Sequence, residues 1–148
     1  EGVNAIKTNA RNQDTVPVLN VHRVAVNDEV EIVLEGSNTR VTAIITTTSS
    51  KTLGLEPGKT VVVLVKAPWV ILVSDMEGVK FSARNQFAAT ITSIREGAVN
   101  AEVNMRLEGG EAMTAIVTNT SVKNMGLEAG KPITAMIKAS HVIVGVKQ

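Results

Sequence analysis

The sequence predicts an all-β fold, organised as two tandem small five-stranded barrels, each with one short helical turn. Three observations predict it: an internal repeat, an alternation of apolar and polar residues with a period of two, and one short helical segment in each repeat. We assign residues 1–7 to a linker, residues 8–76 to the first copy of the repeat and residues 77–148 to the second copy.

The internal repeat organises the whole chain. Residues 41–72, VTAIITTTSSKTLGLEPGKTVVVLVKAPWVIL, align with residues 113–144, MTAIVTNTSVKNMGLEAGKPITAMIKASHVIV, at a constant offset. Upstream, ARNQ occurs at residues 10–13 and again at 83–86, with the offset longer by one residue. The change of one residue falls in the turn that reads LEGSNT in the first copy and LEGGE in the second, and turns tolerate such length changes well.

The alternation within each copy is typical of half-buried strands. In the second copy Val99, Ala101, Val103, Met105 and Leu107 alternate with polar residues, which is the two-residue period of a strand. The first copy repeats the pattern from Val26 to Leu34, with Asp28 as an exception on the apolar side. The turns after these strands are marked by Gly36 and by the pair Gly109 and Gly110.

One segment of each copy has a different pattern, SSKTLGLEPGK in the first and TSVKNMGLEAGK in the second. Each begins with hydroxyl residues suited to cap a helix, continues for about one helical turn, and reaches a glycine, Gly54 or Gly126, suited to end it. About five strands and one helical turn per copy predict a small OB-like barrel.

Composition favours a folded domain in the cytoplasm. Hydrophobic residues make up 44% and charged residues 20% of the sequence, and the absence of Cys excludes disulfides, thiolate metal sites and thiol nucleophiles. The longest apolar run, residues 60–74, is shorter than the roughly 18 residues of a membrane span and contains Lys66 and Pro68, so we expect a buried strand. We find no signal peptide, and the first residue, Glu1, hints that the chain was cut from a longer protein.

Charge distribution favours an anion as ligand. The net charge of +1 excludes a strongly basic nucleic-acid surface as a global property. Asp and Glu are absent from residues 38–55, 112–127 and 129–148, which are rich in hydroxyl and amide groups. A tetrahedral oxyanion offers acceptors alone, so its site needs converging donors and few acceptors.

Three donor-rich clusters recur at equivalent positions in the two copies. They are NARNQ (9–13) and SARNQ (82–86), TTTS (46–49) and TNTS (118–121), and KAP (66–68) and KAS (138–140). Each cluster alone has an ordinary explanation, because Thr is common in strands and an isolated Lys or Arg is usually a solvated charge. His22 and His141 are not equivalent positions, so we interpret them as structural or surface residues, and Trp69 as a core or subunit contact.

Four strings of the second copy, SARNQ, IREGAVNAEV, TAIVTNTSVKNMGLEAGK and AMIKASHVIVGV, together resemble the Mop, or molbindin, family of molybdenum-oxyanion-binding proteins. The first copy resembles the same family with more divergence. Tandem members are of two kinds, free-standing cytoplasmic molbindins and the C-terminal effector half of molybdate-responsive transcription regulators. The segment AIKTNARNQ resembles the linker into that effector half, which favours the regulator.

The resemblance implies that molybdate or tungstate binds between subunits of a homo-oligomer, with no organic cofactor, no metal-ligand site and no membrane partner. It implies a dimer for a regulator, which would bind DNA through a further N-terminal domain, and a trimer for a free-standing molbindin. Asn9 departs from the family pattern, which has Ser there, so one hydroxyl donor becomes an amide. The implied oxyanion-binding residues are Ser82, Arg84, Thr118, Ser121, Lys138 and Ala139, with Asn9, Arg11, Thr46, Ser49, Lys66 and Ala67 in the first copy.

Other classes of function fit the sequence less well. A nucleic-acid-binding OB module stacks bases on aromatic residues, which are 2% of this sequence. An enzyme is not expected, because the repeated motifs hold no paired carboxylates and no His that accompanies a Ser in both copies. The β-barrel modules of importer ATPases lack a tandem pair of such motifs, and a purely structural repeat protein is the remaining alternative.

Overall fold

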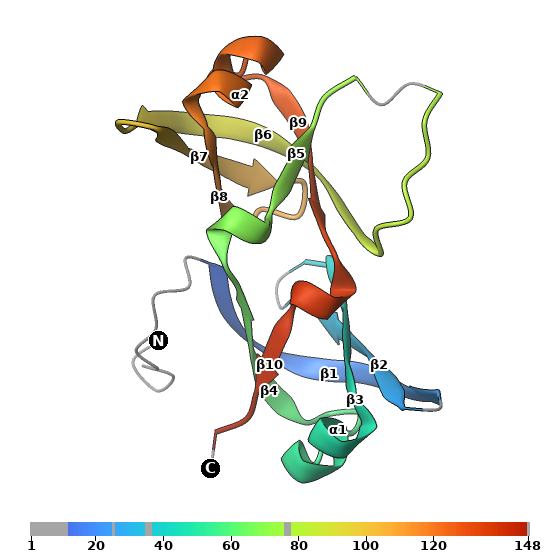
Figure 1. The fold of residues 1–148 in the computed structure, drawn as a ribbon. Helices are drawn as coiled ribbons and strands as arrows, with labels where there is room; N and C mark the ends of the chain where they lie inside the picture. Colours follow the sequence, from blue (N-terminus) through green and yellow to red (C-terminus); the bar gives the residue numbers. More distant parts are fainter. Residues whose placement is uncertain (1–11, 25, 35–36, 76–77, 148) are drawn as a thin grey trace. The chain divides into compact units, whose positions relative to one another are not determined.

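The computed structural model describes residues 12–24, 26–34, 37–75 and 78–147. The chain divides into two compact units, which we describe separately (Figure 1). The first unit comprises residues 1–66 and 140–148, and the second comprises residues 67–139.

The first unit is one antiparallel sheet with the strand order β10-β4-β1-β2-β3. A short helix, α1 (Thr47–Leu53), directly follows β3. The strands are β1 (Asn12–Val24), β2 (Asn27–Val33), β3 (Arg40–Thr46), β4 (Thr60–Val65) and β10 (Ile143–Gly145).

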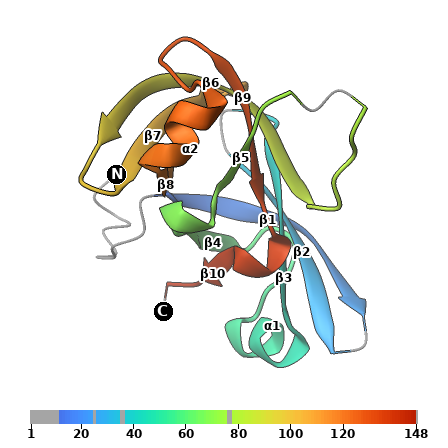
Figure 2. The ribbon, with the colours of Figure 1, turned by 45° about the horizontal axis from the view of Figure 1, so that its top comes forward.

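The second unit repeats this plan with the strand order β5-β9-β6-β7-β8. The helix α2 (Asn119–Met125) directly follows β8, as Figure 2 shows. The strands are β5 (Ile71–Val73), β6 (Asn85–Glu96), β7 (Asn100–Leu107), β8 (Ala112–Thr118) and β9 (Pro132–Ile137). The predicted all-β class, with five strands and one short helix per copy, is therefore confirmed. Among the described residues the strand pairings of each unit form an open row, so each sheet is an antiparallel half-barrel.

Each unit takes one outer strand from the other repeat. β5 belongs to the first repeat in sequence but pairs with β9, and β10 belongs to the second repeat but pairs with β4. The chain leaves the first unit after Lys66, where the 3-10 turn η2 (Ala67–Trp69) begins. It returns to the first unit after Ala139, within the 3-10 turn η3 (Ala139–His141) that follows Lys138. Residues 60–74, which we expected to form one buried strand, therefore form β4, η2 and β5.

A bulge in the longest strand of each sheet lets that strand serve two neighbours. The register of β1 against β2 shifts between Val18 and Asn20, and that of β6 against β7 shifts between Ile91 and Ser93. The first part of β1 pairs with β4 and the later part pairs with β2, and β6 divides in the same way between β9 and β7. A bulge bends its strand and increases the local twist, which curves the sheet around its core.

The predicted alternation is confirmed along β2 and β7, where Val30, Ile32 and Val103 are fully buried. It is wrong at its first position, because Val26 and Val99 are 75% and 70% exposed. Both valines lie in the turns before β2 and β7, where the two-residue period of the strand has not yet begun.

The helices begin earlier than predicted and extend over seven residues rather than one turn. Thr46 and Thr118 are their N-caps, and Gly54 and Gly126 end them with left-handed backbone angles φ of 66° and 62°. Gly110 occupies the predicted turn with φ 102°, and Gly36 lies outside the described residues. No helix among the described residues has the length and apolar character needed to cross a membrane.

Candidate functional site

The hydroxyl clusters form the same structure in both units. Thr46 Oγ1 donates to Ser49 Oγ at 2.9 Å and accepts from the backbone N–H of Ser49 at 3.1 Å. Thr118 and Ser121 repeat these two bonds at 2.9 and 3.0 Å. Capping therefore explains why these hydroxyls recur. Because the proton of the threonine is used within the pair, the serine hydroxyl keeps its own proton to donate to a ligand.

The SARN and KA motifs meet at one end of the ladder between β6 and β9. Asn85 and Ile137 are the last pair of this ladder. The residues next to them, Arg84 and Lys138, therefore lie side by side just beyond its end. Both side chains are exposed. In the first unit Asn12 pairs with Val65 in the same way, which places Lys66 at the equivalent end.

Two amide side chains that we did not select from the sequence hold these motifs in place. Asn85 is 2% exposed and its Nδ2 donates to the carbonyl oxygen of Ile137 at 3.2 Å. Gln86 Nε2 donates to the carbonyl oxygens of Phe81 and Ala83 at 3.0 and 2.8 Å, which folds the chain around Ser82. The equivalent Asn12 donates to Val65 O at 3.3 Å. The identical ARNQ in both copies was the signal that could have identified these residues.

The hydroxyl cap of each unit lies at the opposite end of the sheet. Thr118 pairs with Asn100, next to the end of β6 at Glu96, whereas Arg84 precedes the start of β6 at Asn85. At about 3.3 Å per residue, the length of β6 separates the two clusters by up to roughly 36 Å. Within one unit, the cap and the pair formed by the SARN and KA motifs therefore lie at opposite ends of β6.

Of the twelve predicted site residues, the structure describes all but Asn9 and Arg11, which lie outside the described residues. Ala67 and Ala139 are buried, and each begins a 3-10 turn directly after its lysine. The exposed members are Thr46, Ser49, Lys66, Ser82, Arg84, Thr118 and Lys138, and Ser121 is half-buried.

A buried carboxylate lies beneath the hydroxyl cap of the first unit. Asp28 is fully buried, accepts from Thr47 Oγ1 at 2.7 Å and pairs with Arg23 Nε at 3.2 Å. Burial raises the pKa of Asp28, but the nearby hydroxyl of Ser50, the hydrogen bond from Thr47 and the charge of Arg23 outweigh it and hold the pKa below its ordinary value. Asp28 is therefore a charged group that joins β2 to the start of α1.

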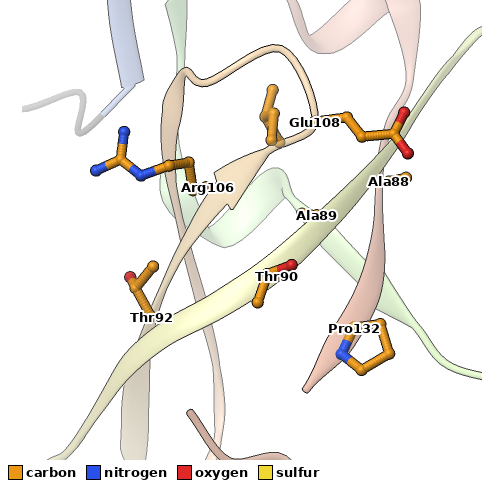
Figure 3. Close-up of a pocket in the computed structure, with 8 residues that line it drawn as sticks. Ala88, Ala89, Thr90, Thr92, Arg106, Glu108 and Pro132 are labelled. Carbon is orange, nitrogen blue, oxygen red and sulfur yellow. The ribbon is translucent and has the colours of Figure 1, made fainter. Parts of the chain in front are cut away.

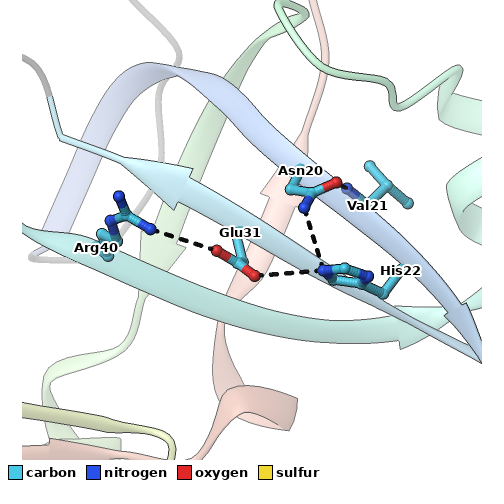
Figure 4. A network of polar contacts seen from close by, with 5 residues as sticks. All are labelled: Asn20, Val21, His22, Glu31 and Arg40. Atoms are coloured by element: carbon cyan, nitrogen blue, oxygen red, sulfur yellow. Dashed lines mark hydrogen bonds and ion pairs between the residues drawn. The ribbon is translucent and has the colours of Figure 1, made fainter.

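A second polar group lies on β1, β2 and β3 (Figure 4). His22 Nε2 is 3.5 Å from Glu31, Arg40 Nη1 is 3.8 Å from the same carboxylate, and Asn20 Nδ2 is 3.1 Å from His22 Nε2. These side chains are half-buried or exposed, and ion pairs of this kind contribute little stability. The position of His22 fits its interpretation as a surface residue.

A hollow on the second unit has none of the predicted site residues in its lining (Figure 3). It has a volume of about 510 Å³ and includes Thr90, Arg106, Glu108 and Pro132 in its wall. Arg106 donates to the carbonyl oxygen of Gly110 at 2.8 Å, and the carboxylate of Glu108 would repel an anion. Among the described residues, no group of three or more His, Cys, Asp or Glu could hold a metal ion.

The sequence matches one protein family twice. Residues 8–72 and residues 82–144 match the model of the TOBE domain. The molybdenum transport protein ModE of Herbaspirillum seropedicae is 36% identical over 144 residues, which cover 97% of this chain and 53% of that protein. The molybdenum-pterin-binding protein MopA of Rhodobacter capsulatus is 37% identical over 141 residues, which cover 95% of this chain and 53% of that protein. The chain thus spans about half the length of these relatives.

A solved structure has the same fold along almost the whole chain. It is described as the cytoplasmic molybdate-binding protein ModG with molybdate bound, and it matches at 44% identity with a TM-score of 0.91. The match covers 96% of this chain and 100% of that one. These similarities bear out the resemblance to tandem Mop proteins. Because the two matches together span more than half of its residues, the chain belongs to the TOBE domain family and carries two copies of the domain in tandem.

Proposed function

We propose that the chain binds molybdate or tungstate as an intact oxyanion, at sites between subunits of a homo-oligomer. The observation that carries this proposal is the placement of Arg84 beside Lys138 at the end of the β6–β9 ladder, fixed by the buried Asn85. Two neighbouring cations without a carboxylate in either motif suit a dianion. The molybdate-bound structure at 44% identity supports the identity of the ion.

The geometry of one unit supports the placement between subunits. The SARN–KA pair supplies charge at one end of the sheet, and the serine hydroxyl of the cap is available at the other end. In the proposed site, the cap that completes the SARN–KA pair comes from a second copy of the chain. In this site Arg84 and Lys138 offset the charge of the ion, while Ser82, Ser121 and the backbone N–H of Ala139 orient it. Thr118 holds Ser121 in position.

Two roles for the whole protein agree with this site. We favour the effector half of a molybdate-responsive, DNA-binding regulator, because the chain spans about half of the ModE relatives. The alternative is a free-standing cytoplasmic molbindin, which is supported by the full-length match to the ModG structure. The reading frame upstream of Glu1 separates them, since a DNA-binding region there supports the regulator. The relatives are described as binding and regulatory proteins, and we propose no catalytic step.

A thermal-shift titration tests the ligand. Molybdate and tungstate should raise the melting temperature with concentration, because a ligand that binds the native state stabilises it by mass action. Hydrogen phosphate should protect much less, since it keeps a proton for which a donor-only site offers no acceptor. Equal protection by phosphate at equal concentration would show that the donor-only site is wrong.

Sedimentation of the same sample tests the assembly. We expect a dimer if the chain is a regulator fragment and a trimer if it is a free tandem molbindin. A stable monomer at micromolar concentration that still binds molybdate would contradict a site shared between subunits.

A further inference from the structure

The two hydroxyl caps have different surroundings, although their own hydrogen bonds are the same. In the first unit Arg23 pairs with the fully buried Asp28 across β1 and β2. In the second unit Glu96 and Ala101 occupy these two positions, as paired residues of β6 and β7. Glu96 is exposed and Ala101 is buried. The first unit therefore carries a half-exposed cation beside its cap where the second unit carries an exposed anion.

The buried carboxylate connects Arg23 directly to the cap. One oxygen of Asp28 accepts from Thr47 Oγ1 at 2.7 Å, and the other lies 3.2 Å from Arg23 Nε. The guanidinium and Thr47 are thus separated by one carboxylate group and two short contacts. Thr47 directly follows Thr46, the N-cap that holds Ser49. Arg23 therefore lies at the end of the sheet where the serine hydroxyl of the first cap is available.

The pair leaves donors of Arg23 for a further partner. Asp28 engages Nε, the side chain of Arg23 is 50% exposed, and among the described residues its terminal Nη groups make no further contact within the hydrogen-bond limits. A fully buried carboxylate lowers the stability of a protein unless it is paired, so we look for a function that Asp28 serves. Holding a planar guanidinium in one orientation is such a role, because less conformational freedom is then lost when that group binds an anion.

We propose that Arg23 is a further oxyanion-binding residue of the first unit, and that Asp28 is the positioning residue that holds it beside the Thr46–Ser49 cap. The inference rests on the proposed function, since it concerns the same bound dianion. Its consequence is that the caps of the two units are unequal. An oxyanion at the first cap receives an additional charged donor, and an oxyanion at the second cap is opposed by Glu96.

Calorimetric titration of the intact chain with molybdate tests this inference. Arg23→Gln should weaken one class of site roughly tenfold, which corresponds to about 1.4 kcal/mol, and should leave the other class unchanged. Arg23→Lys keeps the positive charge but lacks the planar guanidinium, so its molybdate affinity should lie between that of Arg23→Gln and that of the native chain. Arg40→Gln is the matched control, because Arg40 lies at the start of β3, away from Thr46 at the end of that strand and level with the middle of β1, and its substitution removes the same charge. It should bind as the native chain does.

The salt dependence of binding separates a direct contact from a structural effect. Loss of a contact cation should make binding at the affected class less sensitive to salt, which a change of packing alone would not do. The inference is overturned if Arg23→Gln binds molybdate as tightly as Arg40→Gln does. It is also overturned if Asp28→Asn binds molybdate more tightly than the native chain, because the carboxylate would then oppose the ion. If Asp28→Asn fails to fold, the molybdate affinities of the Arg23 variants alone test the inference. A native chain that does not bind molybdate would instead refute the proposed function.

Discussion

Asn85 Nδ2 donates a 3.2 Å hydrogen bond to the carbonyl oxygen of Ile137, and this bond ties the SARN motif to the residue before Lys138. Asn12 makes the equivalent bond to Val65 at 3.3 Å. The charged residues of the candidate site therefore depend on an amide that points into the core and does not itself face the ligand.

Replacing Asn85 by Ala should lower both stability and oxyanion affinity. The free energy of unfolding should fall by about 1 to 3 kcal/mol, because the carbonyl oxygen of Ile137 would lose a buried donor. Urea denaturation measures this change, and titration with molybdate measures the affinity. Asn104→Ala is the control, since Asn104 is half-buried and its Nδ2 bonds the exposed Ser93. If the two variants bind molybdate equally well, Asn85 does not position the site.

Replacing Gly54 by Ala should destabilise the end of α1. Gly54 has φ 66°, a left-handed conformation that costs a residue with a Cβ atom about 1 to 2 kcal/mol. Gly145→Ala serves as the comparison, because an added Cβ there meets no heavy atom within 4 Å and the backbone is not left-handed. Its free energy of unfolding should stay equal or rise slightly. Equal losses from both substitutions would show that the C-cap does not control the stability of this segment.

Asp28 should make the protein sensitive to acid. The folded-state pKa of Asp28 lies below its ordinary value of 3.8, so folding favours the ionised carboxylate. The stability that it contributes is complete above pH 3.8 and is lost as the pH falls through the folded-state pKa. The measurement is the urea midpoint as a function of pH between neutral and strongly acidic solution.

Two variants isolate this contribution. Asp28→Asn should be less stable than the native chain at neutral pH and should lose less stability on acidification, because it has no proton to gain. Glu56→Gln removes an exposed carboxylate and should follow the native acid profile. Parallel profiles for Asp28→Asn and the native chain would place the acid sensitivity elsewhere.

Most of the fold could be predicted from the sequence because it is encoded locally and twice. The two-residue period identified β2 and β7, and the glycines at 54 and 126 identified the ends of both helices. The exchange of β5 and β10 between the units could not be predicted in this way. Strand exchange leaves the alternation of apolar and polar residues in each repeat unchanged. It changes only which strand is the partner, and the alternation does not specify the partner.

The candidate site was predicted at the level of its motifs but not of its support. Hydroxyl and basic residues repeat visibly, whereas the roles of Asn85 and Gln86 follow from strand register and loop conformation. Asp28 was noticed as an exception to the apolar pattern, but its contacts with Thr47 and Arg23 join three elements that are separated in the sequence. Such contacts require the tertiary structure.

Substitutions in the second repeat should rank the candidate binding residues by charge. Arg84→Ala or Lys138→Ala should weaken molybdate binding roughly tenfold to a hundredfold, because charged hydrogen bonds contribute about 1.5 to 3 kcal/mol each. Ser82→Ala should cost less, since a neutral hydrogen bond contributes about 0.5 to 1.5 kcal/mol. In the first repeat, Asn9→Ser should tighten binding by restoring the hydroxyl of the family pattern. Calorimetry measures each affinity.

The control for charge removal is Lys131→Gln. Lys131 is exposed, pairs with Glu128 at 3.3 Å and lies beside Pro132, which pairs with Thr90 in the middle of β6, away from both donor clusters. This variant removes the same unit of charge as Lys138→Ala and should bind molybdate as the native chain does. Suppose instead that the Arg84, Lys138 and Lys131 variants all bind equally well. Arg84 and Lys138 would then be ordinary solvated charges, and the repeated motifs would have to be explained by the fold alone.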